Sequence, residues 1–106
     1  MTPRQRLPNR RSCENFNLNV GGQRYCVSIG RFGNGELAEI FITNGKVGSD
    51  ADAAAKDSAV VASIALQFGV PVDVIRHALL RDAQGRASSP LGCALDILAK
   101  DFGSAR

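Results

Sequence analysis

The sequence contains no tryptophan, one tyrosine and one histidine, and its three cysteines are widely spaced with no C-x-x-C motif. These residues are too few for a disulfide framework or a structural zinc site. No apolar run approaches the roughly 18 residues of a membrane-spanning helix, and no apolar stretch follows the basic N-terminus as a secretory signal requires. We therefore expect a protein of the reducing cytoplasm, whose cysteines act as small apolar side chains.

A chain of 106 residues and 11.2 kDa is long enough for one small domain, so we do not expect a multidomain enzyme. Hydrophobic residues make up 44% and charged residues 22%, which is ordinary for a globular protein. We expect a basic flexible arm over residues 1–13, one domain over residues 14–102 and a tail over residues 103–106.

The positive charge is concentrated at the N-terminus. The first eleven residues contain Arg4, Arg6, Arg10 and Arg11 and no acidic residue, whereas the net charge of the whole chain is only +3. A short basic arm on a nearly neutral body attracts phosphate groups, so these arginines are candidate nucleic-acid ligands. The alternative interpretation is a frayed terminus that only adds solubility.

Hydrophobic alternation predicts three strands in the first half of the chain. Residues 16–20, 23–32 and 36–43 place apolar side chains at every second position. The Gly21-Gly22 pair between the first two strands favours a two-residue hairpin, and Gly33-Asn34-Gly35 predicts a second turn. The three segments therefore form an antiparallel meander, with Leu37 and Phe41 expected on the face away from the core.

Helical signals follow the strands. Ser49 with Asp52 three residues later is a capping-box pattern, and Gly69 is a C-cap, so a helix is predicted between them. Its expected buried stripe consists of Ala53, Val60, Val61, Ile64, Ala65 and Phe68. A second helix is predicted over residues 71–81. A third begins at Pro90 after a serine cap.

These elements predict an α+β fold, a three-stranded antiparallel meander followed by two to three helices packed on one face. The other face of such a sheet has no cover in the sequence. Leu37 and Phe41 on that face suggest a homodimer. Phe32 and Phe41 with Arg24 and Arg31 offer an alternative, the stacking and binding of nucleic acid.

Two segments are candidate anion sites. In the first, Lys46, Gly48 and Ser49 form a glycine-rich turn at the start of a helix, where backbone N–H groups and a lysine charge converge. In the second, Arg86, Ser88 and Ser89 precede the Pro90 helix. The alternatives are a tight strand-to-helix turn for the first segment and a solvated loop with a serine cap for the second.

No catalytic group is expected from the remaining polar residues. His77 has no serine or cysteine nucleophile at a local spacing, so a structural or solvent-facing histidine is expected. Asp52 and Lys56 are expected on the wet face of the first helix. Asp57 interrupts the expected apolar stripe, and we expect it to stay in water where the helix overhangs the sheet.

Three short motifs in one order are similar to a known family. They are Glu39-Ile40-Phe41-Ile42, then Gly45-Lys46-Val47-Gly48-Ser49, then Ala65-Leu66-Gln67-Phe68-Gly69-Val70-Pro71. Together with the first hairpin and the proline-started helix, they resemble the TSCPD domain family. That family includes the domain near the C-terminus of many vitamin B12-dependent ribonucleotide reductases. The resemblance covers roughly residues 14–100.

The sequence departs from the family at the motif that names it. The Thr-Ser-Cys-Pro-Asp stretch corresponds here to Ala87-Ser88-Ser89-Pro90-Leu91, so Ser89 replaces the cysteine and Leu91 the aspartate. This puts in doubt any thiol or metal chemistry that depends on that cysteine. Cys93 lies about one helical turn beyond Ser89 and is not a substitute.

The resemblance implies a link to ribonucleotide reductase without implying reductase activity. It favours a non-catalytic binding or regulatory module, accessory to ribonucleotide reduction or nucleotide metabolism, with a reductase or a nucleotide as partner and with no cofactor or metal. The alternative is a small nucleic-acid-binding protein that uses its arginine arm. An independent enzyme ranks last, because the sequence shows no nucleophile–base pair, carboxylate pair or metal cluster.

Overall fold

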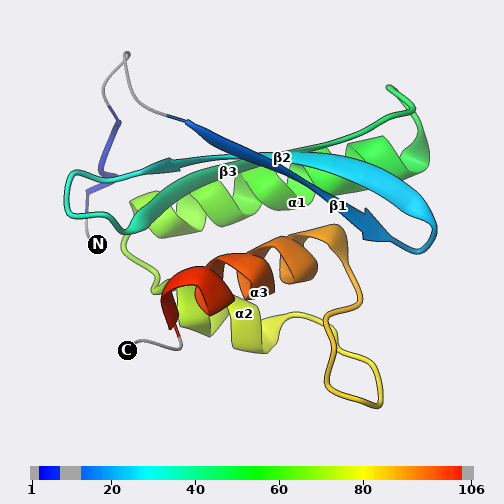
Figure 1. Ribbon diagram of the computed structural model, residues 1–106. Helices are drawn as coiled ribbons and strands as arrows, with labels where there is room; N and C mark the ends of the chain where they lie inside the picture. The colour runs from blue at the N-terminus through cyan, green and yellow to red at the C-terminus, as the bar shows by residue number, and fades with distance from the viewer. Residues whose placement is uncertain (1–2, 8–12, 104–106) are drawn as a thin grey trace.

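The structure is a computed structural model that describes residues 3–7 and 13–103. Its elements follow one another as three strands and then three helices (Figure 1). The strands are β1 (Glu14–Val20), β2 (Gln23–Arg31) and β3 (Leu37–Asn44). The helices are α1 (Asp50–Gln67), α2 (Val72–Ala78) and α3 (Pro90–Gly103). The predicted α+β fold class and the order of its elements are confirmed.

The sheet is an antiparallel meander in the order β1-β2-β3, so β1 and β3 are its two edges. Gly21 and Gly22 join β1 to β2 with φ of 58° and 77°, and Val20 faces Gln23 across the turn. Two consecutive residues with positive φ make a type I′ turn, which suits the twist of a hairpin and favours glycine at both positions. The predicted two-residue hairpin is therefore confirmed.

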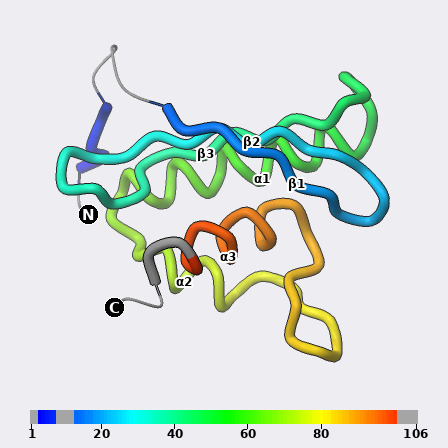
Figure 2. Tube along the Cα trace, viewed as in Figure 1, coloured from blue at the N-terminus to red at the C-terminus, as the bar shows by residue number. Residues whose placement is uncertain are grey.

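All three helices lie on one side of the sheet (Figures 1 and 2). The long helix α1 packs along β3, and α3 packs beneath β1. The core forms where the inward side chains of the sheet meet these two helices. Its fully buried large side chains are Val27, Ile29, Ile40, Ile42 and Leu95. In the described part of the chain, no helix is long and apolar enough to cross a membrane.

A β-bulge corrects the predicted faces of the third strand. The register between β2 and β3 shifts at Gly30 and Arg31, so that Arg31 pairs with Leu37 and Ala38 is skipped. Leu37 is consequently buried, although strict alternation placed it on the open face. Phe41 does lie on the open face and is 45% exposed. One of the two apolar residues that suggested a dimer is thus part of the core.

The predicted buried stripe of α1 is wrong. Val60, Val61 and Ile64 are exposed, and the helix buries two other sets of residues. The small or apolar set is Ala55, Ala59, Ala62 and Leu66, and the polar set is Asp52, Ser63 and Gln67. The alanines allow the helix to approach the sheet closely, and the polar residues face backbone groups of β3. Asp57 is exposed, as expected.

Part of the N-terminal arm contacts the domain. The backbone N–H of Gln5 donates to the carbonyl oxygen of Gln67 at 2.7 Å, and Arg4 Nε donates to Gln67 Oε1 at 2.8 Å. The last turn of α1 has no basic residue of its own. Arg4 therefore supplies a cation beside the negative end of the α1 dipole, and Gln5 satisfies a carbonyl that the helix leaves without an intrahelical partner.

Candidate functional site

A tight hairpin at residues 81–87 stands beside the start of α3. Arg81 and Ala87 form an isolated antiparallel bridge, and the N–H of Asp82 donates to the carbonyl oxygen of Arg86 at 2.8 Å. Asp82 Oδ1 accepts from the N–H groups of Gln84 and Arg86, both at 2.9 Å. The Asp82 carboxylate thus organises the turn from within. The sequence predicted this segment only as a polar loop.

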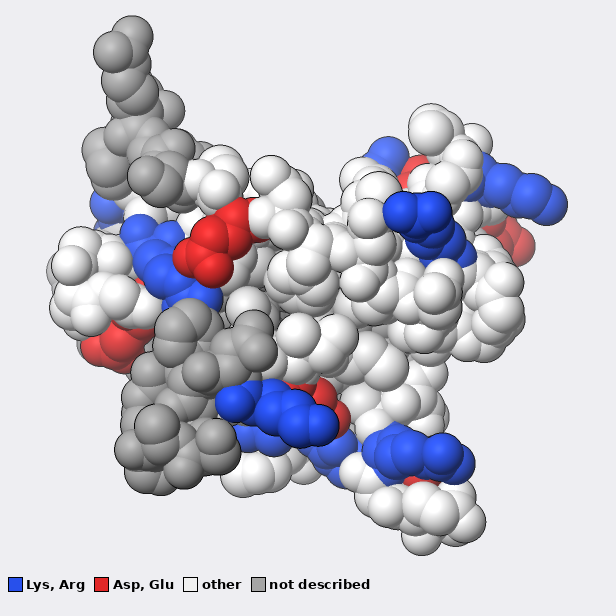
Figure 3. Space-filling model, viewed as in Figure 1, with Lys and Arg blue, Asp and Glu red and all other residues white. Residues whose placement is uncertain are grey.

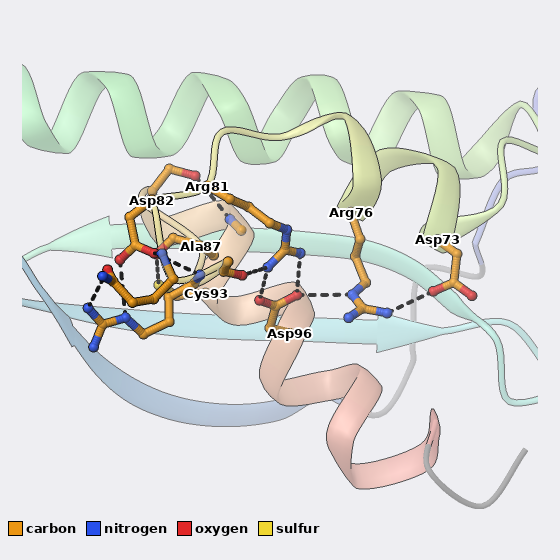
Figure 4. A network of polar contacts seen from close by, with 12 residues as sticks. Asp73, Arg76, Arg81, Asp82, Ala87, Cys93 and Asp96 are labelled. Atoms are coloured by element: carbon orange, nitrogen blue, oxygen red, sulfur yellow. Dashed lines mark hydrogen bonds and ion pairs between the residues drawn. The ribbon is translucent and has the colours of Figure 1, made fainter.

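Asp96 of α3 joins this hairpin to α2 (Figure 4). Its carboxylate accepts two hydrogen bonds from Arg81, at 2.8 and 2.9 Å, and one from Arg76 Nε at 3.1 Å. Arg76 also bonds Asp73 at 3.0 Å, and Arg81 bonds the carbonyl oxygen of Gly85. Each of these charges is therefore compensated by a partner.

The surroundings of Asp96, Asp82 and Cys93 change the pKa values of these side chains. The hydrogen bonds from Arg81 and Arg76 lower the pKa of Asp96. The backbone N–H of Arg86 lowers the pKa of Asp82. Burial raises the pKa of Cys93, whose Sγ donates to the carbonyl oxygen of Ala87 at 3.5 Å. Cys93 therefore remains a protonated thiol near neutral pH, which makes it a poor nucleophile.

A hollow of about 750 Å³ lies between β1, the 81–87 hairpin and α3. β1 lines it from Asn17 to Val20, together with Gly21 of the following turn. The opposite wall consists of Asp82, Gly85, Arg86, Ala87, Cys93, Asp96 and Ile97. Arg86 is paired with Asp82 at 3.1 Å, yet its side chain is 75% exposed, so its guanidinium remains accessible at the rim. The hollow combines main chain, amide and guanidinium groups with the apolar surface of Ile97.

The turn before α1 is filled by a side chain of the protein itself. Asp52 accepts from the N–H of Asn44 at 2.9 Å and from the N–H of Gly48 at 3.0 Å. These bonds, with that of Lys56 at 3.0 Å, lower the pKa of Asp52 to about 2. Asp52 is only 2% exposed, so its predicted place on the wet face is wrong. The Asp52 carboxylate occupies the position that an anion would take beside Gly48.

Ser49 is the N-cap of α1, but it forms only half of the predicted capping box. Its Oγ accepts from the N–H of Asp52 at 3.2 Å and donates to the carbonyl oxygen of Lys46 at 2.7 Å. The Asp52 side chain turns to Asn44 and Gly48 instead of returning to Ser49. At the other candidate segment, Ser89 Oγ caps α3 by accepting from the N–H of Gly92 at 3.1 Å, as predicted for that cap.

The structure does not bring the two candidate anion segments together. The turn at residues 45–49 lies at the start of α1, at the upper right of Figure 1, whereas residues 81–89 lie at the lower right and lead into α3. Lys46, Arg86 and Ser88 are exposed. On the face seen in Figure 3, basic and acidic side chains alternate and do not form one basic patch. Anion binding by either segment stays a prediction.

The remaining predicted residues are dispersed. Arg6 is exposed, and Arg10 and Arg11 lie outside the described residues. His77 is exposed, as expected, and Asp73 beside it pairs with Arg76. Among residues 3–7 and 13–103, no group of three or more His, Cys, Asp or Glu side chains is placed to hold a metal ion.

Polar side chains of α1 bond to the outer edge of β3, a feature that the hydrophobic pattern of the sequence did not predict. Ser63 Oγ accepts from the N–H of Ile40 at 2.8 Å and donates to its carbonyl oxygen at 2.9 Å. Gln67 Nε2 donates to the carbonyl oxygen of Ala38 at 3.2 Å. With Asp52 on Asn44, three buried polar side chains of one helix bond to outward backbone groups of Ala38, Ile40 and Asn44 on this edge strand. The spacing of Ser63 and Gln67 at i and i+4 was the available signal.

A family model and two relatives of known name place the chain in the same family. A sequence model described as the TSCPD domain matches residues 1–100. The vitamin B12-dependent ribonucleotide reductase of Agrobacterium fabrum is 39% identical over 70 residues, which are 66% of this chain and 6% of that enzyme. The enzyme of the same name from Bradyrhizobium diazoefficiens is 34% identical over 73 residues, 69% of this chain and 6% of that enzyme. The chain therefore spans a small fraction of these relatives, and no solved structure gives a significant match.

Proposed function

Since this chain belongs to the TSCPD domain family, we propose that it is a non-catalytic binding or regulatory module that serves ribonucleotide reduction or nucleotide metabolism. The observation that carries the proposal is the match to a small segment of vitamin B12-dependent ribonucleotide reductases. A segment that is 6% of such an enzyme is too short to hold a whole active site, but it is long enough for one binding domain.

The chemistry of the described residues supports binding over catalysis. The charged groups around the hollow are compensated by one another, with Asp96 held by Arg81 and Arg76. Cys93 is kept protonated by burial, and Ser89 is used as a helix cap. The free thiols at Cys13, Cys26 and Cys93 agree with a reducing cytoplasm as the compartment of this module.

For a nucleotide or phosphate ligand, the segment at Arg86, Ser88 and Ser89 is the better candidate. Arg86 is 75% exposed at the rim of the hollow, and its pairing with Asp82 engages Nε, so other N–H donors of the guanidinium can meet a phosphate. At Lys46, Gly48 and Ser49, by contrast, the Asp52 carboxylate already accepts the N–H of Gly48 and repels a second anion. We therefore expect weak nucleotide binding that depends on Arg86 more than on Lys46.

The first experiment combines affinity capture with calorimetry. The full chain is immobilised and the captured proteins are identified by mass spectrometry. ADP and dATP are titrated into the free chain. We expect recovery of a ribonucleotide reductase, and a nucleotide affinity that falls about fivefold in Arg86→Ala and less in Lys46→Ala. Absence of both a reductase and a nucleotide signal would overturn the proposal.

The same experiment tests nucleic-acid binding by the arm as the alternative. Deleting the arm would also remove the contacts of Arg4 and Gln5 with Gln67, so the informative variant replaces Arg6, Arg10 and Arg11 by alanine and keeps Arg4. Nucleic-acid binding by the arm would be favoured if nucleic-acid-binding proteins are captured, and if nuclease treatment, high salt and this variant each abolish their capture.

A further inference from the structure

The hairpin geometry determines which backbone groups of β1 face outward. In a two-residue hairpin, Val20 and Gln23 next to the turn exchange hydrogen bonds, and the pairs then alternate along the ladder. Val20, Leu18 and Phe16 therefore bond to β2, whereas the N–H and C=O groups of Asn19, Asn17 and Asn15 point away from the sheet.

The opposite edge verifies this alternation. Counting onward through β2, the outward residues of β3 have even numbers, and they include Ile40 and Asn44. These are the residues whose backbone groups bond to Ser63 and Asp52 of α1. The deduced register therefore agrees with hydrogen bonds made outside the sheet.

The outward groups of β1 have no such partners in the described part of the chain. No hydrogen bond from another described element reaches the backbone of Asn15, Asn17 or Asn19, and all three residues are exposed. Exposed edge strands with unpaired N–H and C=O groups are templates for a further strand. Here the edge also borders the hollow of about 750 Å³, whose far wall is the 81–87 hairpin and α3.

We propose that the outer edge of β1 is a docking site for an extended peptide segment of a partner protein, which adds to the sheet as a fourth strand. The backbone of Asn17 and Asn19 would provide the pairing, which recognises main chain and not a particular side chain. The side chains of the segment would point alternately to the two faces of the sheet.

The lining of the hollow defines the chemistry of this segment. On the helix side, side chains of the segment meet Ile97, which is 38% exposed, and the half-buried Cys93. On the other side they lie beside the Asn17 and Asn19 side chains. A segment that alternates apolar and polar residues fits both sides, and an acidic residue near the exposed Arg86 adds an ion pair.

The 81–87 hairpin also argues for a segment in preference to a second copy of this chain. The hairpin lines the open hollow opposite residues 17–21, so this part of the edge faces the hairpin and α3. A single strand fits along such a hollow, whereas a second domain would bring its own hairpin against this one. If the captured reductase supplies the segment, this inference rests on the proposed function for the identity of the partner.

The test uses a matched pair of variants at one position. A phage library of random dodecapeptides is selected on the native chain, and a selected peptide is synthesised and its binding measured by fluorescence anisotropy. Asn17→Pro removes the outward N–H without removing a bond to β2, and Asn17→Ala removes the side chain but keeps the N–H. We expect about tenfold weaker binding to Asn17→Pro and nearly native binding to Asn17→Ala.

Amide exchange provides the second readout and covers the case in which Asn17→Pro does not fold. On the native chain, the bound peptide should slow exchange of the amides of Asn15, Asn17 and Asn19. The inference is overturned if no peptide is selected, if folded Asn17→Pro binds as well as the native chain, or if these amides exchange unchanged. This test contains neither reductase nor nucleotide, so its failure is distinguishable from failure of the proposed function.

Discussion

Along the outer edge of β3, polar side chains of α1 bond to the strand, whereas along the outer edge of β1 the backbone borders a hollow. The three side chains are buried, and each bonds to a backbone group of β3: Ser63 to Ile40, Gln67 to Ala38 and Asp52 to Asn44. Asn15, Asn17 and Asn19 stay exposed on the other side. The same three-stranded sheet is thus closed on one edge and available on the other.

The difference shows how polar residues can be assigned to structure or to binding. A buried serine, glutamine or aspartate on a helix suggests a site, but here each one satisfies backbone groups that would otherwise be buried without partners. The asparagines of β1 look unremarkable in the sequence, yet they mark the edge whose main chain remains accessible. The two edges therefore differ in whether their outward backbone groups have hydrogen-bond partners, and the residue types alone do not reveal this.

The largest expected effect comes from opening the closed edge. Ser63→Ala leaves the N–H and C=O of Ile40 buried without their partner, which should lower the free energy of unfolding by about 1–3 kcal/mol. Urea unfolding measures it. Ser58→Ala is the matched control, since Ser58 Oγ donates to the carbonyl oxygen of Ala55 within α1 and not to the strand. Equal losses in the two variants would contradict a role for Ser63 at the edge.

A smaller, pH-dependent effect is expected at the other end of this edge. Folding lowers the pKa of Asp52 from 3.8 to about 2, so its contribution to stability is complete above the unfolded value and is lost as the pH falls toward 2. Asp52→Asn should therefore be less stable than the native chain at neutral pH, with a difference that shrinks between about pH 5 and pH 2.

Unfolding midpoints in urea across this pH range measure the difference. Asp50→Asn removes an exposed acidic side chain from the first turn of the same helix and so controls for the change in net charge. If the difference in urea midpoint between Asp52→Asn and the native chain stays constant down to pH 2, the charged Asp52 carboxylate does not stabilise this edge.

The smallest effect is expected at the open edge. Asn19→Pro should change the free energy of unfolding by less than about 1 kcal/mol, because the lost N–H faces water. Ser28→Pro in the central strand provides the contrast, since its N–H pairs with β3 and the loss of this ladder bond should cost about 1–3 kcal/mol. Thermal unfolding of both variants measures the contrast. A large loss in Asn19→Pro would mean that the outward register of β1 is wrong.

Local signals predicted most of the fold. Alternation located the three strands, and paired glycines located the first hairpin, because a type I′ turn needs two positive φ angles. Ser49 and Ser89 were correctly identified as caps, since a cap requires only a hydroxyl near the N–H groups of the next turn. These features depend on residues a few positions apart, which a single sequence contains.

The predictions failed where distant contacts outweighed local pattern. The stripe of α1 was assigned to its larger apolar residues, but close packing on β3 selects alanines and the polar side chains that reach the edge. Leu37 was placed on the wrong face because a bulge at Gly30 and Arg31 cannot be read from alternation. The hollow beside β1 joins residues 17–21 to residues 82–97, which no spacing in the sequence relates.

The α+β class, the order of the elements, their caps and turns, and the family could all be read from the sequence, because each depends on short-range pattern or on direct similarity. The closed edge of the sheet, the carboxylate in the turn before α1 and the position of the hollow became visible only in the folded chain. Unpaired backbone groups bond to the side chains that lie nearest in space, and packing between segments far apart in the chain sets that proximity.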